Sequence, residues 1–346
     1  MPATRSGIYQ LNEGVQVEQV HSCYLCGGLG RVVYERLRDR LFGAPGEWGF
    51  LRCDSCGLTW LTPRPVSEDL GKIYARYHTH GAGVPPRPAV ARLIDVVLAT
   101  RFGYSRVSTQ RLPRLVGCLA GSVRVIREMA GFEIMYLHAS NRGRLLDVGC
   151  GAGEFLVRMR NLGWEVQGVE VDPNAARVAR EHGLRVFVGQ LRQTPVPACS
   201  LDVITLNHVI EHVYDPIAML AECRRLLVKG GKLVILTPNS ASLGHWFFSG
   251  SWRGLEPPRH IHLLSLRSLR TCAERAGFSV AVLRTTARGA RSFWSGSARI
   301  KHAGERYSER LLAVGKWLFF ILANAACFFR PRSGEELFLV ATKEQE

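Results

Sequence analysis

The sequence predicts an α/β fold, a doubly wound, Rossmann-like sheet that follows a small cysteine-rich module. The main observation is GRLLDVGCGAGEFLVRM at residues 143–159, which reads as a short apolar strand, a glycine turn and a helix. A second strand follows in EVQGVEVD, and Pro173 opens the next helix. Because ligands of such folds lie over the carboxyl ends of the strands, we expect the site at this turn.

Composition limits the class of protein. The chain has 346 residues, of which 47% are hydrophobic, enough for one large domain and an accessory one. Its opening residues are polar and contain Gly and Pro, so we expect no secretory signal and a cytoplasmic location. In that compartment, ten cysteines favour metal binding over a disulfide framework.

The formal charge of +16 is unevenly placed. Residues 87–144 carry ten arginines against three acidic residues, and residues 284–332 carry ten Lys or Arg against two. One interpretation is that these are solvated faces. The other is an anionic partner, such as a membrane surface, a pyrophosphate-bearing substrate or RNA.

Two Cys-x-x-Cys-Gly motifs stand near the start, and they contribute Cys23, Cys26, Cys53 and Cys56. Four thiolates at tetrahedral reach favour a closed, structural zinc site, and a redox role is the weaker alternative. We therefore expect a zinc-ribbon-like module over residues 1–65. A basic linker and helical segment follows over 66–142, and the α/β domain spans 143–346.

The glycine turn contains Gly149, Gly151 and Gly153. This Gly-x-Gly-x-Gly spacing is neither the Gly-x-Gly-x-x-Gly of dinucleotide sites nor a P-loop. Glu170 ends the second strand, where an acidic residue can accept hydrogen bonds from both hydroxyls of a ribose. Asp172 is expected to cap the following helix. A ribose grip without a phosphate clamp favours a nucleoside cofactor such as S-adenosylmethionine.

The stretch from Arg144 to about Phe278 resembles class I S-adenosylmethionine-dependent methyltransferases. The resemblance rests on LLDVGCGAG, GVEVDPNAARVA, LDVITLNHVIEHVYDP, LLVKGGKLVILTPN and AGF, in that order. It implies a seven-stranded sheet of order 3-2-1-4-5-7-6 with strand seven antiparallel. The cysteine motifs and CGLTWLTPRP also resemble front ends of methyltransferases from sugar and cell-envelope polysaccharide pathways.

The resemblance also implies roles for residues of the site. Asp147 and the turn glycines would hold the methionine end of the cofactor, and Glu170 its ribose. Gln190 would border the adenine, at a position where many relatives have an acidic residue. Asn207 and His208 would line the sulfonium side.

Two histidine groups compete for the acceptor proton. His260 and His262 lie in WRGLEPPRHIHLLSLRSL, in the loop after strand five, and in an extended segment both would point the same way. Similar sugar C-methyltransferases have His-Glu-His there, whereas this chain has Ile261, which favours a hydroxyl acceptor with His260 as base. His208 belongs to NHVIEHV, where the Glu211-His212 pair serves either catalysis or loop structure.

An apolar helical insert is expected around residues 300–332. Its uninterrupted core, residues 317–329, has 13 residues, too few to span a bilayer. The segment 311–330 is interpreted either as a helix lying in a membrane interface or as a lid or dimer helix buried in protein.

The sequence therefore predicts a methyltransferase with S-adenosylmethionine as cofactor and a structural zinc ion. The expected reaction is O-methylation of a sugar or of a lipid-linked glycan or small-molecule hydroxyl. The expected location is cytoplasmic, either free of the membrane or peripheral at its inner face. The alternatives are an RNA methyltransferase and a catalytically inactive relative. Strand four shows LNHVIEH instead of the Pro-Pro-aromatic pattern of base-amino methylation, which disfavours nucleic acid as a partner.

Overall fold

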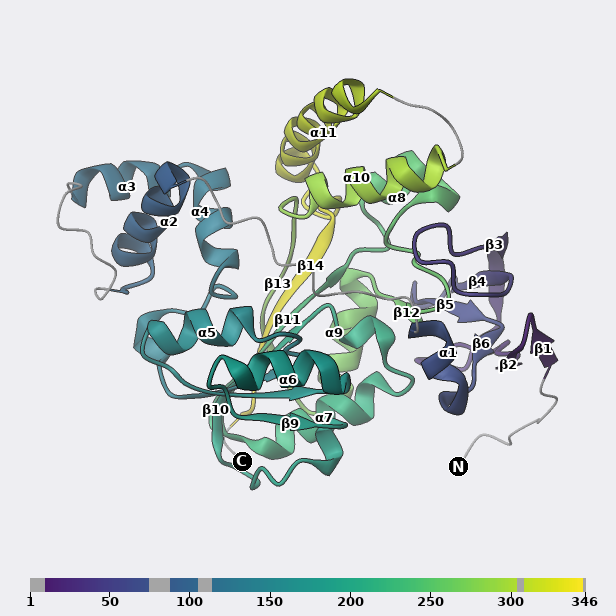
Figure 1. Ribbon diagram of the computed structural model, residues 1–346, viewed down its shortest axis with the longest axis horizontal. Helices are drawn as coiled ribbons and strands as arrows, with labels where there is room; N and C mark the ends of the chain where they lie inside the picture. The colour runs from purple at the N-terminus through teal and green to yellow at the C-terminus, as the bar shows by residue number, and fades with distance from the viewer. Residues whose placement is uncertain (1–9, 75–87, 105–113, 304–307, 345–346) are drawn as a thin grey trace.

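The computed structural model describes residues 10–74, 88–104, 114–303 and 308–344. In Figure 1 the cysteine module lies on the right of the central sheet, helices α2–α4 lie on the left, and helices α8, α10 and α11 lie above. These three parts surround the edge at which the parallel strands end.

The central sheet has seven strands in the order β13-β14-β11-β10-β7-β8-β9. Among the described strands of this sheet, β14 alone runs antiparallel to its neighbours, which are β11 and β13. Numbered from the glycine-turn strand, this order is the predicted 3-2-1-4-5-7-6, so the expected topology is confirmed. The strands are β7 (Arg144–Val148), β8 (Glu165–Glu170), β9 (Val186–Val188), β10 (Leu201–Asn207), β11 (Leu227–Pro238), β13 (Ser279–Thr286) and β14 (Glu336–Thr342).

Both faces of this sheet are covered, because successive strand residues point to opposite sides. On one side Leu146 packs in a cluster with Leu220 of α7 (Pro216–Leu226) and Leu269 of α9 (Leu266–Arg275). On the other side, Leu145 packs in a cluster with Leu156 of α5 (Glu154–Asn161). Helices α6 (Pro173–Glu181), α2 (Pro88–Arg101) and α4 (Arg124–Phe132) join that second cluster, and α3 (Arg114–Ser122) packs on α2 and α4.

The cysteine module and the α/β domain share a four-stranded sheet. Strands β3 (Gly30–Leu37), β4 (Trp48–Cys53) and β5 (Thr59–Thr62) are completed by β12 (His262–Leu263). A second small sheet contains β1 (Gln10–Asn12), β2 (Val15–Glu18) and β6 (Arg64–Pro65). Helix α1 (Leu70–Tyr74) follows.

The apolar insert forms two helices, α10 (Ala290–Lys301) and α11 (Glu309–Phe329), beside α8 (Leu243–Phe248). Helix α11 has 21 residues, because Gly315 and Lys316 continue the helix instead of ending it. The prediction of a core too short for a bilayer was therefore wrong about length. Its window Leu312–Phe329 is long and apolar enough to cross a membrane by length and composition alone, and 17% of it is buried.

A buried ion network fixes the loop after β11 to the module. Arg259 is fully buried and donates to Asp39 at 2.8 Å and to Glu256 at 3.2 Å. Asp39 lies in the turn between β3 and β4, where it also accepts backbone N–H groups of residues 41, 42 and 44.

We predict that Asp39→Ala lowers the free energy of unfolding by about 3 kcal/mol, because it removes one partner of a buried guanidinium. Chemical denaturation followed by circular dichroism measures this change. Asp54→Ala, which breaks an exposed pair with Arg31, is the matched control and should cost less than about 1 kcal/mol. Equal losses in the two variants would contradict the assigned role of the network.

Candidate functional site

One large cavity lies over the carboxyl ends of the parallel strands. Its volume is about 2740 Å³, larger than the roughly 300–1,000 Å³ of an ordinary ligand pocket. The glycine turn and the ends of β8 and β10 form its floor, and α4, α10, α11 and the loop at 253–260 form its walls. There is room for a nucleoside cofactor together with an acceptor.

The glycine turn lines the cavity with backbone. Gly149 and Gly151 lie in the left-handed region, at φ of +70° and +55°. A Cβ on Gly149 would lie 2.7 Å from Cγ2 of Val209, so a side chain there is excluded. The turn thus leaves bare peptide groups for a ligand, as the sequence predicts.

Glu170 joins the turn to the end of the second strand. One carboxylate oxygen accepts the Gly151 N–H at 2.8 Å, and the other accepts the Asp172 N–H at 2.9 Å. Each oxygen keeps a further lone pair, so the carboxylate is held in place with capacity left for hydroxyl donors. Asp172 accepts the Asn174 N–H at 2.8 Å as the N-cap of α6, which confirms the predicted cap.

Asp147 and Gly153 lie behind the cavity wall, although both were expected to hold the methionine end. The Asp147 carboxylate accepts the Thr205 hydroxyl at 2.6 Å, and burial raises the pKa of Asp147 to about 7. Gly153 begins α5 in a left-handed conformation that brings it against Leu184. Both residues therefore support the turn from beneath.

Gln190 and Asn207 line the cavity where the sequence places them, after β9 and at the end of β10. Both residues are exposed. The Gln190 N–H bonds to the side chain of Gln193, which fixes the backbone at the expected adenine position.

His208 lines the cavity, but its hydrogen bonds do not suit a general base. Its Nδ1 lies 3.1 Å from a Glu211 oxygen, and its Nε2 lies 2.9 Å from a Glu336 oxygen. Burial alone would lower the pKa of His208, yet the two carboxylates raise it to about 10. An imidazolium that donates both of its N–H groups has no lone pair to take the proton of an acceptor hydroxyl. The geometry therefore does not support His208 as the base, and it favours a role as a positive charge held between Glu211 and Glu336.

His260 and His262 do not share a direction, contrary to the expectation. His260 lines the cavity, whereas His262 lies in β12 and its Nδ1 donates to the Val213 carbonyl at 3.0 Å. The His262 ring packs against Tyr24, between the two cysteines of the first motif, with ring centroids 5.4 Å apart. His262 thus belongs to the contact between module and domain, and it is removed from the catalytic candidates.

The remaining candidate base, His260, is buried and neutral. Its Nδ1 donates to the Gly254 carbonyl at 2.7 Å, and burial lowers the pKa of His260 to about 4. His212 of the alternative pair lies beside it, with ring centroids 4.8 Å apart. The structure therefore brings together His260 and the Glu211-His212 pair, which the sequence presents as competitors.

Arginines and aromatic rings line the upper part of the cavity, a feature that no motif in the sequence indicates. The guanidinium of Arg291 lies over the rings of Trp317 and Phe320, at 4.9 and 5.5 Å from their centroids. Arg253 of the loop, Arg288 of the connection between β13 and α10, and Arg291 of α10 line this part together with Trp317, Phe320 and Asn324 of α11. Only the excess of basic residues in 284–332 points to it.

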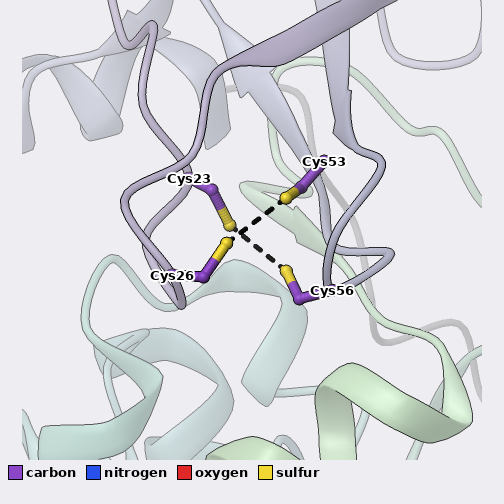
Figure 2. A group of neighbouring side chains, drawn as sticks. All are labelled: Cys23, Cys26, Cys53 and Cys56. Carbon is purple, nitrogen blue, oxygen red and sulfur yellow. Dashed lines mark hydrogen bonds between the residues drawn. The ribbon is translucent and has the colours of Figure 1, made fainter.

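The four predicted zinc ligands gather at one point (Figure 2). The sulfur atoms of all four lie within 4.8 Å of one another, and the Cys23–Cys56 and Cys26–Cys53 pairs are 3.4 and 3.3 Å apart. The two motifs have the same turn geometry. In each, the N–H of the first cysteine donates to the carbonyl of the residue five positions later, and the carbonyl of that cysteine accepts the N–H of the motif's glycine. Tetrahedral coordination at 2.3 Å requires sulfur atoms about 3.8 Å apart, close to this arrangement.

Comparisons with known proteins identify the family of this chain. A family described as a methyltransferase domain matches residues 125–282. A protein of Mycolicibacterium smegmatis, named as a probable S-adenosylmethionine-dependent methyltransferase, is 30% identical over 204 residues, which cover 56% of this chain and 76% of that protein. The chain belongs to the S-adenosylmethionine-dependent methyltransferases.

Two further comparisons describe the extent of the similarity. A ubiquinone biosynthesis O-methyltransferase of Xanthomonas oryzae is 39% identical over 103 residues, which cover 28% of this methyltransferase chain and 43% of that protein. A solved S-adenosylmethionine-dependent methyltransferase of Archaeoglobus fulgidus is 20% identical, with a TM-score of 0.41 over 71% of this chain and 98% of that one.

We predict that Glu170→Gln raises the Kd for S-adenosylmethionine by about 10–100-fold, because hydrogen bonds to a charged carboxylate are lost or weakened. Isothermal titration calorimetry with the cofactor measures the change. Glu165→Gln, at the exposed opposite end of β8, is the matched control and should leave the Kd unchanged. A Kd within twofold of the wild type for Glu170→Gln would contradict the ribose role.

Proposed function

We propose that this methyltransferase transfers the methyl group of S-adenosylmethionine to a hydroxyl group of a sugar or lipid-linked small molecule. The observation that carries the proposal is the single cavity onto which the cofactor turn, the His260 ring and the arginine-aromatic wall all open. The methyl group on a positively charged sulfur is already activated. The protein therefore has to align the acceptor, exclude water and remove the proton of the acceptor hydroxyl.

The His260 side chain, which lines the cavity, supports oxygen as the acceptor atom. The Nδ1 of His260 is a donor to a backbone carbonyl, so its Nε2 carries the lone pair. A neutral imidazole can take one hydroxyl proton. Burial lowers the pKa of His260, but the nearby carboxylates of Glu256 and Glu211 act in the opposite direction and would stabilise the imidazolium that forms. The ubiquinone biosynthesis relatives are named as O-methyltransferases, which agrees with this acceptor class.

The wall opposite the cofactor supports an acceptor with an anionic group and an apolar part. Arg253, Arg288 and Arg291 supply positive charge, and Trp317 and Phe320 supply apolar surface. Guanidinium groups bind phosphate in a bidentate manner, so a lipid-linked phosphate or pyrophosphate would satisfy both features.

We expect label from methyl-labelled S-adenosylmethionine to enter the lipid extract or the water-soluble sugar fraction of the source cells, and not total RNA. Scintillation counting and mass spectrometry of the three fractions check this result. His260→Asn should retain cofactor binding and lose label transfer by about 100-fold or more, because proton transfer is worth that much. Label in RNA alone, or full transfer by His260→Asn, would overturn the corresponding part of the proposal.

Docking at a membrane is a second part of the proposed function. Helix α11 packs one face, with Phe319, Ala323 and Cys327, into the protein and leaves the opposite face exposed. The exposed face includes Leu318, Ile321, Leu322, Phe328 and Phe329. An apolar helix face beside arginines suits an anionic lipid interface, and the same helix lines the cavity.

We predict that the protein floats with liposomes that contain anionic lipid, and that the double variant Ile321→Ser, Leu322→Ser reduces the floating fraction several-fold. Both residues lie on the exposed face, so the variant leaves the cavity face of α11 intact. Leu119→Ser, at an exposed leucine of α3, is the control and should float like the wild type. Equal flotation of all three proteins would contradict docking through α11.

We also propose that the cysteine cluster binds one structural zinc ion. A closed set of four thiolates suits zinc and leaves no position for substrate. Three of the cysteines belong to the same hydrophobic cluster as strands β10 and β11, so the ion would hold the module against the domain.

We predict that the cobalt-substituted protein shows near-ultraviolet thiolate-to-cobalt absorption, and that Cys26→Ser lowers this absorption and the melting temperature. The reason is that three thiolates and a hydroxyl bind the ion more weakly than four thiolates. Cys118→Ser changes an exposed cysteine outside the cluster and is the control. Unaltered spectra for Cys26→Ser would contradict the site.

A further inference from the structure

Three electron-pair donors converge at the acceptor side of the cavity. One ring nitrogen of His212, one of His260 and a carboxylate oxygen of Glu211 all lie within 4.8 Å of one another. Both histidines line the cavity, and the Glu211 side chain is buried directly behind them. The two rings meet edge to face, with their centroids 4.8 Å apart.

The tautomers of both histidines follow from their hydrogen bonds. The His212 Nδ1 lies 3.0 Å from the Arg259 carbonyl oxygen, and the His260 Nδ1 lies 2.7 Å from that of Gly254. A carbonyl oxygen only accepts, so each Nδ1 carries the proton and each Nε2 carries a lone pair. The Tyr74 hydroxyl oxygen, 3.3 Å from the His212 Nδ1, then accepts from the same N–H. A histidine that donates one N–H to a backbone carbonyl while the other nitrogen is free is typical of metal ligands.

Glu211 is oriented in the same way. One oxygen accepts from His208 at 3.1 Å, and the other accepts the Thr237 hydroxyl at 2.9 Å. Its backbone carbonyl accepts the N–H of Ile261, the residue after His260. Each carboxylate oxygen retains a lone pair for another partner. All three groups are therefore held in place by atoms outside the cluster.

The cluster brings one nitrogen of each imidazole ring within 4.8 Å of a carboxylate oxygen and of each other, the spacing that one shared cation requires. Two histidines and one carboxylate are the ligand set of catalytic zinc sites and of the facial triad of non-haem iron, and both leave coordination positions open to substrate.

We propose that Glu211, His212 and His260 bind a divalent transition-metal ion that also contacts the acceptor hydroxyl. The inference rests on the proposed O-methylation, and it makes His260 a ligand in place of a free base. A bound ion would lower the pKa of the hydroxyl, as Zn²⁺ lowers the pKa of bound water to about 7. The O–H bond would then break, and the proton would leave to solvent. The oxygen then forms a bond to the methyl carbon, and the S–C electron pair returns to sulfur.

Manganese titration tests the site separately from the cysteine cluster. With zinc already in the thiolate site, added Mn²⁺ prefers nitrogen and oxygen ligands. Electron paramagnetic resonance of the free Mn²⁺ should then show one ion bound per wild-type chain. His212→Gln and Glu211→Gln should weaken this binding by more than 100-fold. Thr237→Val keeps all three ligands and should weaken it by about 10–100-fold, as loss of an outer-sphere hydrogen bond does.

His245→Gln is the matched control. Its Nδ1 also bonds to a backbone carbonyl, that of Ser240, but its Nε2 is occupied by the Tyr34 hydroxyl. This variant should bind Mn²⁺ like the wild type. Circular dichroism and calorimetry with S-adenosylmethionine verify that each variant is folded.

The outcomes separate this inference from the proposed function. Loss of label transfer on treatment with a chelator, with cofactor binding retained and transfer restored by Mn²⁺ or Zn²⁺, would support a metal-bound acceptor. Undiminished transfer by chelated protein, or no Mn²⁺ bound by folded wild type, would overturn the metal site and leave O-methylation standing. Mn²⁺ binding without transfer to any acceptor would instead overturn the proposed function.

Discussion

The geometry of the site depends on one backbone contact between distant parts of the chain. Strand β12, only two residues long, pairs His262 with Trp60 and Leu263 with Thr59 of the cysteine module. The buried Arg259–Asp39 pair lies immediately before it, and the Ile261 N–H bonds to the Glu211 carbonyl. His260 lies between these anchors, so the cysteine module helps to position His260 in the wall of the cavity.

The same contact explains how the long connection between β11 and α9 is held in place. Residues 239–265 connect β11 to α9 and would be free to move if only their ends were held. Pairing to β5 and the buried charges convert the loop into part of a sheet that has its own hydrophobic core. The module is therefore best regarded as a structural part of the catalytic domain.

Local patterns were enough to predict the glycine turn, the Asp172 cap and the cysteine cluster, because each depends on neighbouring residues. The sheet order was predicted from the resemblance to class I methyltransferases and not from local patterns. The direction of His262 was not predictable, since it depends on a strand partner 202 positions earlier, Trp60. The charge of His208 depends on Glu336, which comes from a strand at the other end of the domain. Glu335 and Glu336 form an unusual acidic pair before an apolar strand, and this was the available signal.

The length of α11 was underestimated for a different reason. Gly315 and Lys316 interrupt the apolar run in the sequence. Neither residue ends the helix, because α11 packs against α10. The uninterrupted apolar run therefore gave the length of only the second part of the helix, and the first part before residue 317 was missed. Which face is covered follows only from the tertiary structure, in which α10 and β13 contact the helix.

The position of β14 has a consequence for the way the protein is made. This strand is inserted between β11 and β13, although it follows both of them in the chain. While a ribosome is still translating residues before 336, the nascent domain has an unpaired β11 edge, and β13 has no neighbour. Glu336 arrives with β14 itself, so the contact that holds His208 and the pairing of β14 with β11 and β13 are completed by the same event.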